Sequence, residues 1–329
     1  MNIASYVEVN FGQILISRWG ILFMMKQAVL VTGAGGLLGS KVIEMLRVLN
    51  VDVIATDIKN PDLDCPFLAA DFMDPSSVRA LFDHPIGSII HCGAISGPML
   101  GRDDPAGTIR INVDGTVTLL EEVRKRRLGR FIYCGSIAAY GATGSVTGTG
   151  SVTTDAPLAA ADIYGASKAA GEMMVRAYSH EHGVDACILR IGWVYGPKRR
   201  TRSLIYNLIR DALDGRQTVI AHDGKHAIQQ VHVDDVARGL IRAWQANDIR
   251  GRVFNLTGGV RHTMRDIAAL VASIVPQTRY QFTDGISYPD VEQSLFDITD
   301  TVQALDWKPG ITLDAGIRSY ADWLQTNEF

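Results

Sequence analysis

The chain has 329 residues, 47% of them hydrophobic and 20% charged, which is the composition of a folded globular protein with a large core. Its formal net charge of -3 disfavours a nucleic-acid backbone or an anionic membrane surface as a partner, so the expected partners are small molecules. No apolar stretch approaches the roughly 20 residues that cross a bilayer, and a cytoplasmic protein is expected.

Residues 1-24 precede the first regular pattern and lack the basic start, apolar middle and small-residue cleavage site of a signal peptide. Met25 directly precedes the strand-like "KQAVLVTG". We therefore expect either that translation naturally starts at Met24 or Met25, or that residues 1-24 form a loose arm outside the fold. Deleting them is expected to leave folding and activity intact.

From Gln27 onward, short apolar runs alternate with helical patterns. The expected strands are 28–33, 52–57, 87–94, 130–136 and 186–196, and the expected helices between them are 39–50, 76–84, 112–127 and 164–181. Such alternation is typical of a parallel sheet that is covered by helices on both faces. The sequence therefore predicts an α/β protein with a doubly wound sheet of six or seven strands, a Rossmann fold.

After Pro197 the elements become shorter and mixed, which indicates a smaller mixed α/β lobe that binds the substrate. The larger domain is expected to span 25-196, and 197-329 to form mainly the lobe, with some segments returning to the larger domain. A substrate crevice is expected between them, at the carboxyl ends of the strands. Gly141 to Asp155, almost entirely Gly, Thr and Ser, is expected to be a mobile loop without packed structure.

The stretch "VLVTGAGGLLGS" places Gly33, Gly36 and Gly39 after a strand and at the start of a helix. Bare glycines let the backbone approach a pyrophosphate, whose charge the helix amides then bind. The alternative is an ordinary glycine-rich turn, but the strand and helix that the motif requires are both present. Asp57, at the end of the next strand, suits the adenosine ribose hydroxyls and repels a 2'-phosphate, which favours NAD over NADP. Asp71 and Phe72 follow the third strand and are placed to hold the adenine edge.

Tyr164 and Lys168 share one helical face, because they are four residues apart in "YGASK". A tyrosine base must fall about 3 units from its reference pKa of about 10, and a nearby ammonium together with oxidised nicotinamide could provide that shift. Ser136 ends the preceding strand and could hold the reacting oxygen. A surface helical pair is the common alternative for Tyr and Lys at this spacing. Along the chain the glycine motif (the cradle), Asp57, Ser136 and Tyr164 follow one another in the order expected of an active site, which favours the catalytic interpretation.

The chain resembles the extended short-chain dehydrogenase/reductases, the NAD-dependent epimerase/dehydratase group, through "TGAGGLLG", "HCGA", "NVDGT", "YCGSIAAYG", "YGASK", "LRIGWVYGP", "HVDDVA" and "LDWKP". The resemblance implies that Tyr164 is the base, that Lys168 also binds the nicotinamide ribose and that Ser136 holds the substrate oxygen. It implies further NAD contacts. Besides the residues named above, the full candidate set for NAD binding includes Tyr164 itself and Leu37, Leu38, Gly93, Ala94, Asn112 and Gly192. It also implies a homodimer built on two helices per subunit, and Ser96 is a further candidate for substrate contact.

Departures from the family pattern bear on the reaction. Dehydratases carry an acidic pair where this chain has Ile137 and Ala138, so sugar-nucleotide dehydration is not expected. Nucleotide-sugar epimerases place an asparagine at the position of Trp193 and an arginine at that of Ile228, both to bind the diphosphate. We therefore favour oxidation of a secondary alcohol on a free sugar or sugar acid. Nucleotide-sugar 4-epimerisation and a non-catalytic NAD-binding regulator are the alternatives.

The cationic turn "KRRTR" follows the last strand of this series at the mouth of the expected crevice. A solvated basic turn is one interpretation. The other is that Arg199 or Arg202 binds a carboxylate or phosphate of the substrate in bidentate fashion, with Trp193 beside it.

Neither disulfides nor metal sites are expected. The cysteines lack CxxC spacing and indicate reduced thiols, which agrees with a cytoplasmic location: Cys65, Cys92, Cys134 and Cys187. The histidines show no metal-ligand spacing, and His232 before Asp234 suits a helix start better than a metal site.

Overall fold

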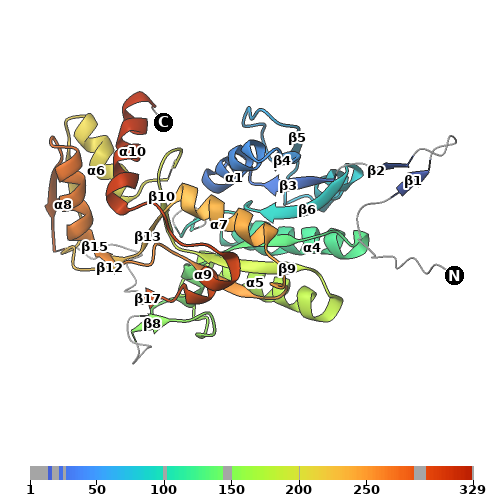
Figure 1. The fold of residues 1–329 in the computed structure, drawn as a ribbon. Helices are drawn as coiled ribbons and strands as arrows, with labels where there is room; N and C mark the ends of the chain where they lie inside the picture. Colours follow the sequence, from blue (N-terminus) through green and yellow to red (C-terminus); the bar gives the residue numbers. More distant parts are fainter. Residues whose placement is uncertain are drawn as a thin grey trace, which may run out of the picture.

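A seven-stranded parallel sheet forms the centre of the larger part of the molecule, with helices on both of its faces (Figure 1). The computed structural model describes residues 14–16, 22–24, 27–98, 102–143, 150–199, 201–284 and 294–327. The strands are β3 (Ala28–Thr32), β4 (Val53–Asp57), β5 (Phe67–Ala69), β6 (Ile86–His91), β7 (Phe131–Ser136), β9 (Ala186–Ile191) and β14 (Val253–Leu256). Their order in the sheet is β14-β9-β7-β6-β3-β4-β5, which confirms the predicted doubly wound fold.

Two hydrophobic cores lie on the two faces of this sheet. On one face, α1 (Leu37–Val48), α7 (Val233–Gln245) and α9 (Thr299–Leu305) contribute apolar side chains such as Leu46, Leu240 and Leu305. On the other face, α2 (Pro75–Ala80), α4 (Gly115–Arg126) and α5 (Ile163–His182) contribute Val78, Leu119 and Val175. The strands between them are buried on both sides, and this explains why they read as nearly continuous apolar runs.

The order of the strands reverses between β3 and β6. The chain runs outward from β3 through β4 to β5, and then returns to β6 and continues through β7 and β9. In open parallel sheets the ligand crevice lies at such a reversal, beyond the carboxyl ends of the strands. Gly33 follows β3 and Gly93 lies two residues after β6, so the glycine motif lies at this crevice.

The expected strand 186–196 is broken at Gly192, and the prediction that it forms a single core strand is wrong. β9 ends at Ile191, and the Gly192 amide then donates to the Leu256 carbonyl at 3.0 Å. The chain leaves the sheet as β10 (Trp193–Tyr195), which pairs with β13 (Gln230–His232). The edge of the large sheet is instead β14, which comes from much later in the chain.

A smaller lobe with its own hydrophobic core lies at one end of the sheet, on the left in Figure 1. Its helices are α6 (Leu204–Leu213), α8 (Met264–Ile274) and α10 (Leu313–Thr326). Two small sheets complete it: β11 (Gln217–Ile220) with β16 (Arg279–Phe282), and β12 (Ala227–Ile228) with β15 (His262–Thr263). The boundary at 196/197 stays a prediction, but the return of α7, α9 and β14 to the large sheet agrees with the expected exchange of segments.

Part of the Gly, Thr and Ser segment 141–155 is packed, so the prediction of a loop without packed structure is wrong for that part. β8 (Ser151–Val152) pairs with β17 (Leu295–Phe296), and Val152 is 1% exposed. The polar composition of the segment concealed this strand pair, because a strand of two residues can be anchored by a single buried apolar side chain. Residues 144–149 of the predicted loop lie outside the described residues.

The remaining elements are short. They are β1 (Ile14–Ile16) and β2 (Leu22–Met24), which pair with each other, α3 (Pro105–Ile109), 3-10 turns at Leu81–Asp83 and Ile137–Tyr140, and a π-helical turn at Arg110–Asp114. Among the described residues, the structure contains no helix of the length and hydrophobicity needed to span a bilayer.

Candidate active site

The glycine motif forms a tight bare-backbone cradle between β3 and β6. Gly33 has φ +63°, and a Cβ placed on it would lie 2.7 Å from the Gly93 Cα. A Cβ on Gly39 would lie 2.1 Å from the Gly33 carbonyl oxygen, so α1 packs directly on the turn. No side chain caps the start of α1, where Leu37 and Leu38 follow Gly36. The uncapped amides and this bare loop fit a pyrophosphate.

Asp57 lies beside this cradle, as predicted from its place after β4. Its carboxylate accepts from the Gly35 amide at 2.9 Å and from the Ile58 amide at 2.7 Å. Phe72 contacts the other side of the cradle, because a Cβ on Gly93 would lie 2.7 Å from its ring. Asp71 accepts from the Met73 amide at 2.8 Å and so stabilises its own turn.

Asp57→Asn is expected to weaken NAD binding and to narrow the preference for NAD over NADP by about tenfold or more, because charge-assisted bonds are worth about 1.5–3 kcal/mol. The amide oxygen of asparagine can still accept from the Gly35 amide, so the cradle should keep its shape. Calorimetric Kd values for both nucleotides check this, with Asp64→Asn, at an exposed carboxylate that pairs with Arg47, as the matched control. An unchanged ratio of the two Kd values would contradict the ribose role.

The predicted catalytic residues meet at the carboxyl end of β7. Asp162 caps α5 through the Gly165 amide at 2.8 Å, so the helix begins just before Tyr164. The Tyr164 hydroxyl lies close enough to the hydroxyls of Ser136 and Ser96 for both to affect its pKa. Burial raises the pKa of Tyr164 above its ordinary value, while these two hydroxyls lower it. The predicted fall in this pKa depends on Lys168 together with bound oxidised NAD, so it stays a prediction.

Lys168 contacts the main chain rather than the hydroxyl of Tyr164. Its Nζ donates to the Cys134 carbonyl at 3.0 Å and lies 5.2 Å from the centre of the Tyr133 ring. The side chain is buried, and burial lowers the pKa of its ammonium. The sequence could not reveal this partner, because a backbone carbonyl leaves no signature in the choice of residue.

Asn112 lies in the π-helical turn that precedes α4. Its side chain exchanges two hydrogen bonds with the backbone of Ile95, at 2.8 and 3.0 Å, and donates to the Ser167 hydroxyl at 2.8 Å. It thereby ties the segment after β6, which includes Gly93 and Ala94, to the helix that carries Tyr164 and Lys168. π-helical turns of this kind are frequent at functional sites.

The cationic turn divides into side chains with different surroundings. Lys198 lies 3.4 Å from Glu44 of α1. The Arg199 guanidinium donates to the carbonyls of Val194 and Thr201, and burial lowers its pKa, opposed by the nearby Tyr320 and Tyr164.

The other two arginines of this turn differ from Arg199. Arg202 is exposed, and Arg200 lies outside the described residues. Arg199 is thus the predicted substrate residue that lies near Tyr164, while Trp193 packs between the lobe core and the 3-10 turn after β7.

A buried ion pair between β9 and α5 escaped the sequence analysis. Arg190 donates to Glu172 through Nε at 2.9 Å and through Nη2 at 2.5 Å, and both side chains are 1% exposed. Arg190 also donates to the Tyr140 hydroxyl at 2.5 Å and to the Thr154 carbonyl at 2.8 Å. An arginine inside an otherwise apolar strand was the available signal, since charged side chains are buried only when they are paired.

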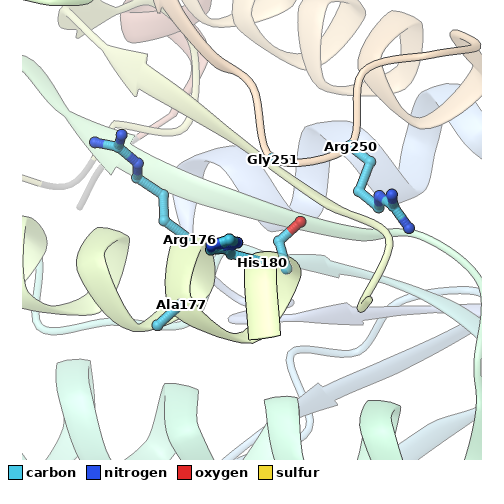
Figure 2. Close-up of a pocket in the computed structure, with 6 residues that line it drawn as sticks. Arg176, Ala177, His180, Arg250 and Gly251 are labelled. Carbon is cyan, nitrogen blue, oxygen red and sulfur yellow. The ribbon is translucent and has the colours of Figure 1, made fainter. Parts of the chain in front are cut away.

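A surface pocket near the end of α5 does not belong to this site (Figure 2). It has a volume of about 520 Å³ and is lined by Arg176, Ala177, Ser179, His180, Arg250 and Gly251. Arg176 and Arg250 point in different directions and do not converge on one point. Arg250 lies beside Gly183, the residue that ends α5, where a positive charge offsets the helix dipole.

No metal-ligand cluster occurs within the ranges that the structure describes. His232 instead accepts from the Asp234 amide at 3.2 Å through Nδ1 and caps α7, as predicted. All four cysteines are free thiols.

The fold and the arrangement at the carboxyl edge of the sheet are those of a dinucleotide-binding enzyme of the Rossmann type. The model of the NAD dependent epimerase/dehydratase family matches residues 29–257. The chain belongs to this family, and its cofactor is NAD.

Relatives with stated activities cover nearly the whole chain. A dTDP-glucose 4,6-dehydratase of Streptomyces griseus is 27% identical over 91% of this chain and 94% of its own length. A UDP-glucuronate 4-epimerase of Thermodesulfobacterium geofontis is 24% identical over 91% and 96%. The crystal structure of a UDP-glucose 4-epimerase from Thermotoga maritima, solved with UDP-glucose, matches with a TM-score of 0.84 and 25% identity, over 91% of this chain and 99% of that one.

Proposed function

We propose that the protein is an NAD-dependent 4-epimerase of a nucleoside-diphosphate sugar. The observation that carries the proposal is the proximity of Tyr164, at the start of α5, to Ser136, at the end of β7 beside the dinucleotide cradle, since this pair can remove the proton of a secondary alcohol. Two relatives that act on UDP-sugars are 4-epimerases, so the comparisons favour this alternative over the net oxidation favoured by the sequence analysis.

Each catalytic side chain has a definite task in this proposal. NAD, when bound, supplies the hydride acceptor. Ser136 holds the sugar oxygen, and Tyr164 accepts its proton during oxidation and returns a proton during reduction. Lys168, bound to the Cys134 carbonyl below, contributes a buried positive charge that favours the ionised tyrosine. Epimerisation requires that the keto sugar rotate in the site, so that the hydride returns to its opposite face.

Net oxidation of a free sugar or sugar acid is the second candidate, and specific residues favour it. Ile228, at the position of a diphosphate-binding arginine, is 3% exposed within the lobe core and has no polar group to offer. Trp193 likewise replaces a polar side chain. A diphosphate would therefore need other ligands, and Arg199, which lies within electrostatic range of Tyr164, is a candidate.

Dehydration has less support, because Ile137 and Ala138 provide no acid to protonate a leaving hydroxyl. A non-catalytic NAD-binding regulator has less support still, because Ser136, Tyr164 and Lys168 are all present and lie together.

Incubation with NAD and two substrate panels distinguishes the candidates. UDP- and dTDP-sugars form one panel, and free sugars and sugar acids form the other. Conversion of a nucleotide sugar to its 4-epimer without accumulation of NADH supports the proposal. Stoichiometric NADH formed from a free sugar or sugar acid would support the second candidate instead.

Arg199→Ala is expected to raise KM by about tenfold or more with a smaller effect on kcat, because a charge-assisted bidentate contact to the anionic substrate is lost. Arg202→Ala tests the exposed arginine of the same turn. Lys198→Ala is the matched control, since Lys198 lies near Glu44 and not near Tyr164. A KM that is unaltered in both arginine variants would leave only a solvated basic turn.

The predicted homodimer would use α4 and α5, which pack together on one face of the sheet. Exposed Met173 (60%) and Met174 (37%) on α5 support this surface. Light scattering after gel filtration measures the mass in solution, and a monomer at micromolar concentration would contradict the proposal.

A further inference from the structure

His91 is the centre of a buried hydrogen-bond chain that joins three elements of the cofactor site. Its Nδ1 lies 2.7 Å from the Thr32 hydroxyl at the end of β3, and its Nε2 lies 3.0 Å from the Thr116 hydroxyl in α4. The Thr32 hydroxyl also accepts from the Gly93 amide at 2.9 Å, and the Thr116 hydroxyl donates to the Asn112 carbonyl at 2.7 Å. His91 itself ends β6.

The Gly93 amide and the Asn112 carbonyl are the two ends of this series of hydrogen bonds, and they determine the direction of the bonds between them. The Asn112 carbonyl can only accept, so it takes the single proton of Thr116, and the oxygen of Thr116 must then accept from His91 Nε2–H. The Gly93 amide can only donate, so the Thr32 oxygen accepts from it and its own proton is available for His91 Nδ1. A neutral imidazole with a bare Nδ1 satisfies all of these groups.

The surroundings of the ring maintain this state. His91, Thr32, Thr116 and Asn112 are each at most 2% exposed. Burial and the nearby Lys168 ammonium lower the pKa of His91 to about 3. Phe72 packs at 5.4 Å between ring centres and also borders Gly93, so the ring cannot move without disturbing the cradle.

We propose that His91 is a positioning residue, a neutral imidazole that holds the Gly93 segment and Asn112 where NAD binding requires them. One end of the hydrogen-bond chain fixes the Gly93 amide against β3. The other end fixes the π-helical turn, from which Asn112 reaches Ile95 and Ser167. In this proposal His91 acts only through its contacts with Thr32 and Thr116 and takes no part in the proton transfer.

His91→Phe tests the proposal, because it keeps an aromatic ring and removes both hydrogen bonds. We expect the Kd for NAD, measured by calorimetry, to rise about tenfold or more, since buried partners are left unsatisfied. Ser88→Ala is the matched control: it removes a buried 2.9 Å hydrogen bond to Trp244 from the same strand, away from the cradle. Its Kd should stay within about twofold. A wild-type Kd for folded His91→Phe would overturn the proposal.

A second measurement does not depend on this variant folding. Nitrogen NMR of the uniformly ¹³C,¹⁵N-labelled wild-type protein reports which imidazole nitrogens carry protons, and the His91 ring signals are assigned through their bonds to the backbone of β6. A protonated Nε2 with a bare Nδ1 at neutral pH is the expected result. A protonated Nδ1 would overturn the proposal, because Nδ1 could then no longer accept from Thr32.

Discussion

Tyr164→Phe should lower kcat by about 10²- to 10⁴-fold, the range typical of a lost general base. Only the hydroxyl is removed, so Ser136 and Ser96 lose one shared partner while the ring still packs at the start of α5. The Kd for NAD should change by no more than about twofold, because the cradle and Asp57 are untouched. Steady-state turnover and calorimetry measure the two quantities separately.

Tyr178→Phe is the matched control for this prediction. Tyr178 lies on the same helix and donates to Glu121 at 2.8 Å, toward α4 and not toward Ser136. Its turnover should remain that of the wild type. If Tyr164→Phe also kept full turnover, the protein would have to use another base. If the wild-type protein turned over no substrate, the interpretation as a non-catalytic regulator would gain support.

Glu172→Gln should destabilise the fold by about 3–5 kcal/mol, because it leaves the Arg190 guanidinium buried without its counter-charge. The pair joins β9 to α5, and Arg190 also reaches the Thr154 carbonyl, so the segment over β7 should loosen with it. Urea unfolding gives the change in free energy of unfolding.

Two further variants make this result interpretable. Glu172→Leu combined with Arg190→Met removes both charges and should recover much of the loss, because well-packed apolar pairs often replace buried ion pairs at little cost. Asp314→Asn breaks the exposed pair with Arg318 and should have no measurable effect. A Glu172→Gln variant as stable as Asp314→Asn would show that water reaches the pair.

The sequence predicted the large sheet and the cradle because both depend on local patterns. Alternating apolar runs and helical periods reflect burial on both sheet faces. Gly33 and Gly39 lie where the backbone passes so close to other backbone atoms that a side chain would not fit. Ser136, Tyr164 and Asp57 follow from their places at strand ends and at a helix start. These inferences need no knowledge of distant contacts.

The errors concern partners that lie far away in the chain. The run 186–196 gives no local sign that β14 will pair with β9 and that Gly192 will turn the strand away. The sequence also could not show that Lys168 donates to the Cys134 carbonyl, because this partner lies 34 residues away. His91 was visible only as part of "HCGA", because its role depends on two threonines from other elements.

The edge strand β14 has a consequence for how the protein is made. A nascent chain that has emerged only as far as Gly196 includes the cradle and Tyr164. At this stage β9 is still an unpaired edge strand, and the apolar face that α7 later covers is still exposed to water. The sheet is completed only when Leu256 has left the ribosome, and Trp307 closes the core later still. The cofactor-binding half therefore matures only when nearly the whole chain is available, and during that interval it depends on protection from aggregation.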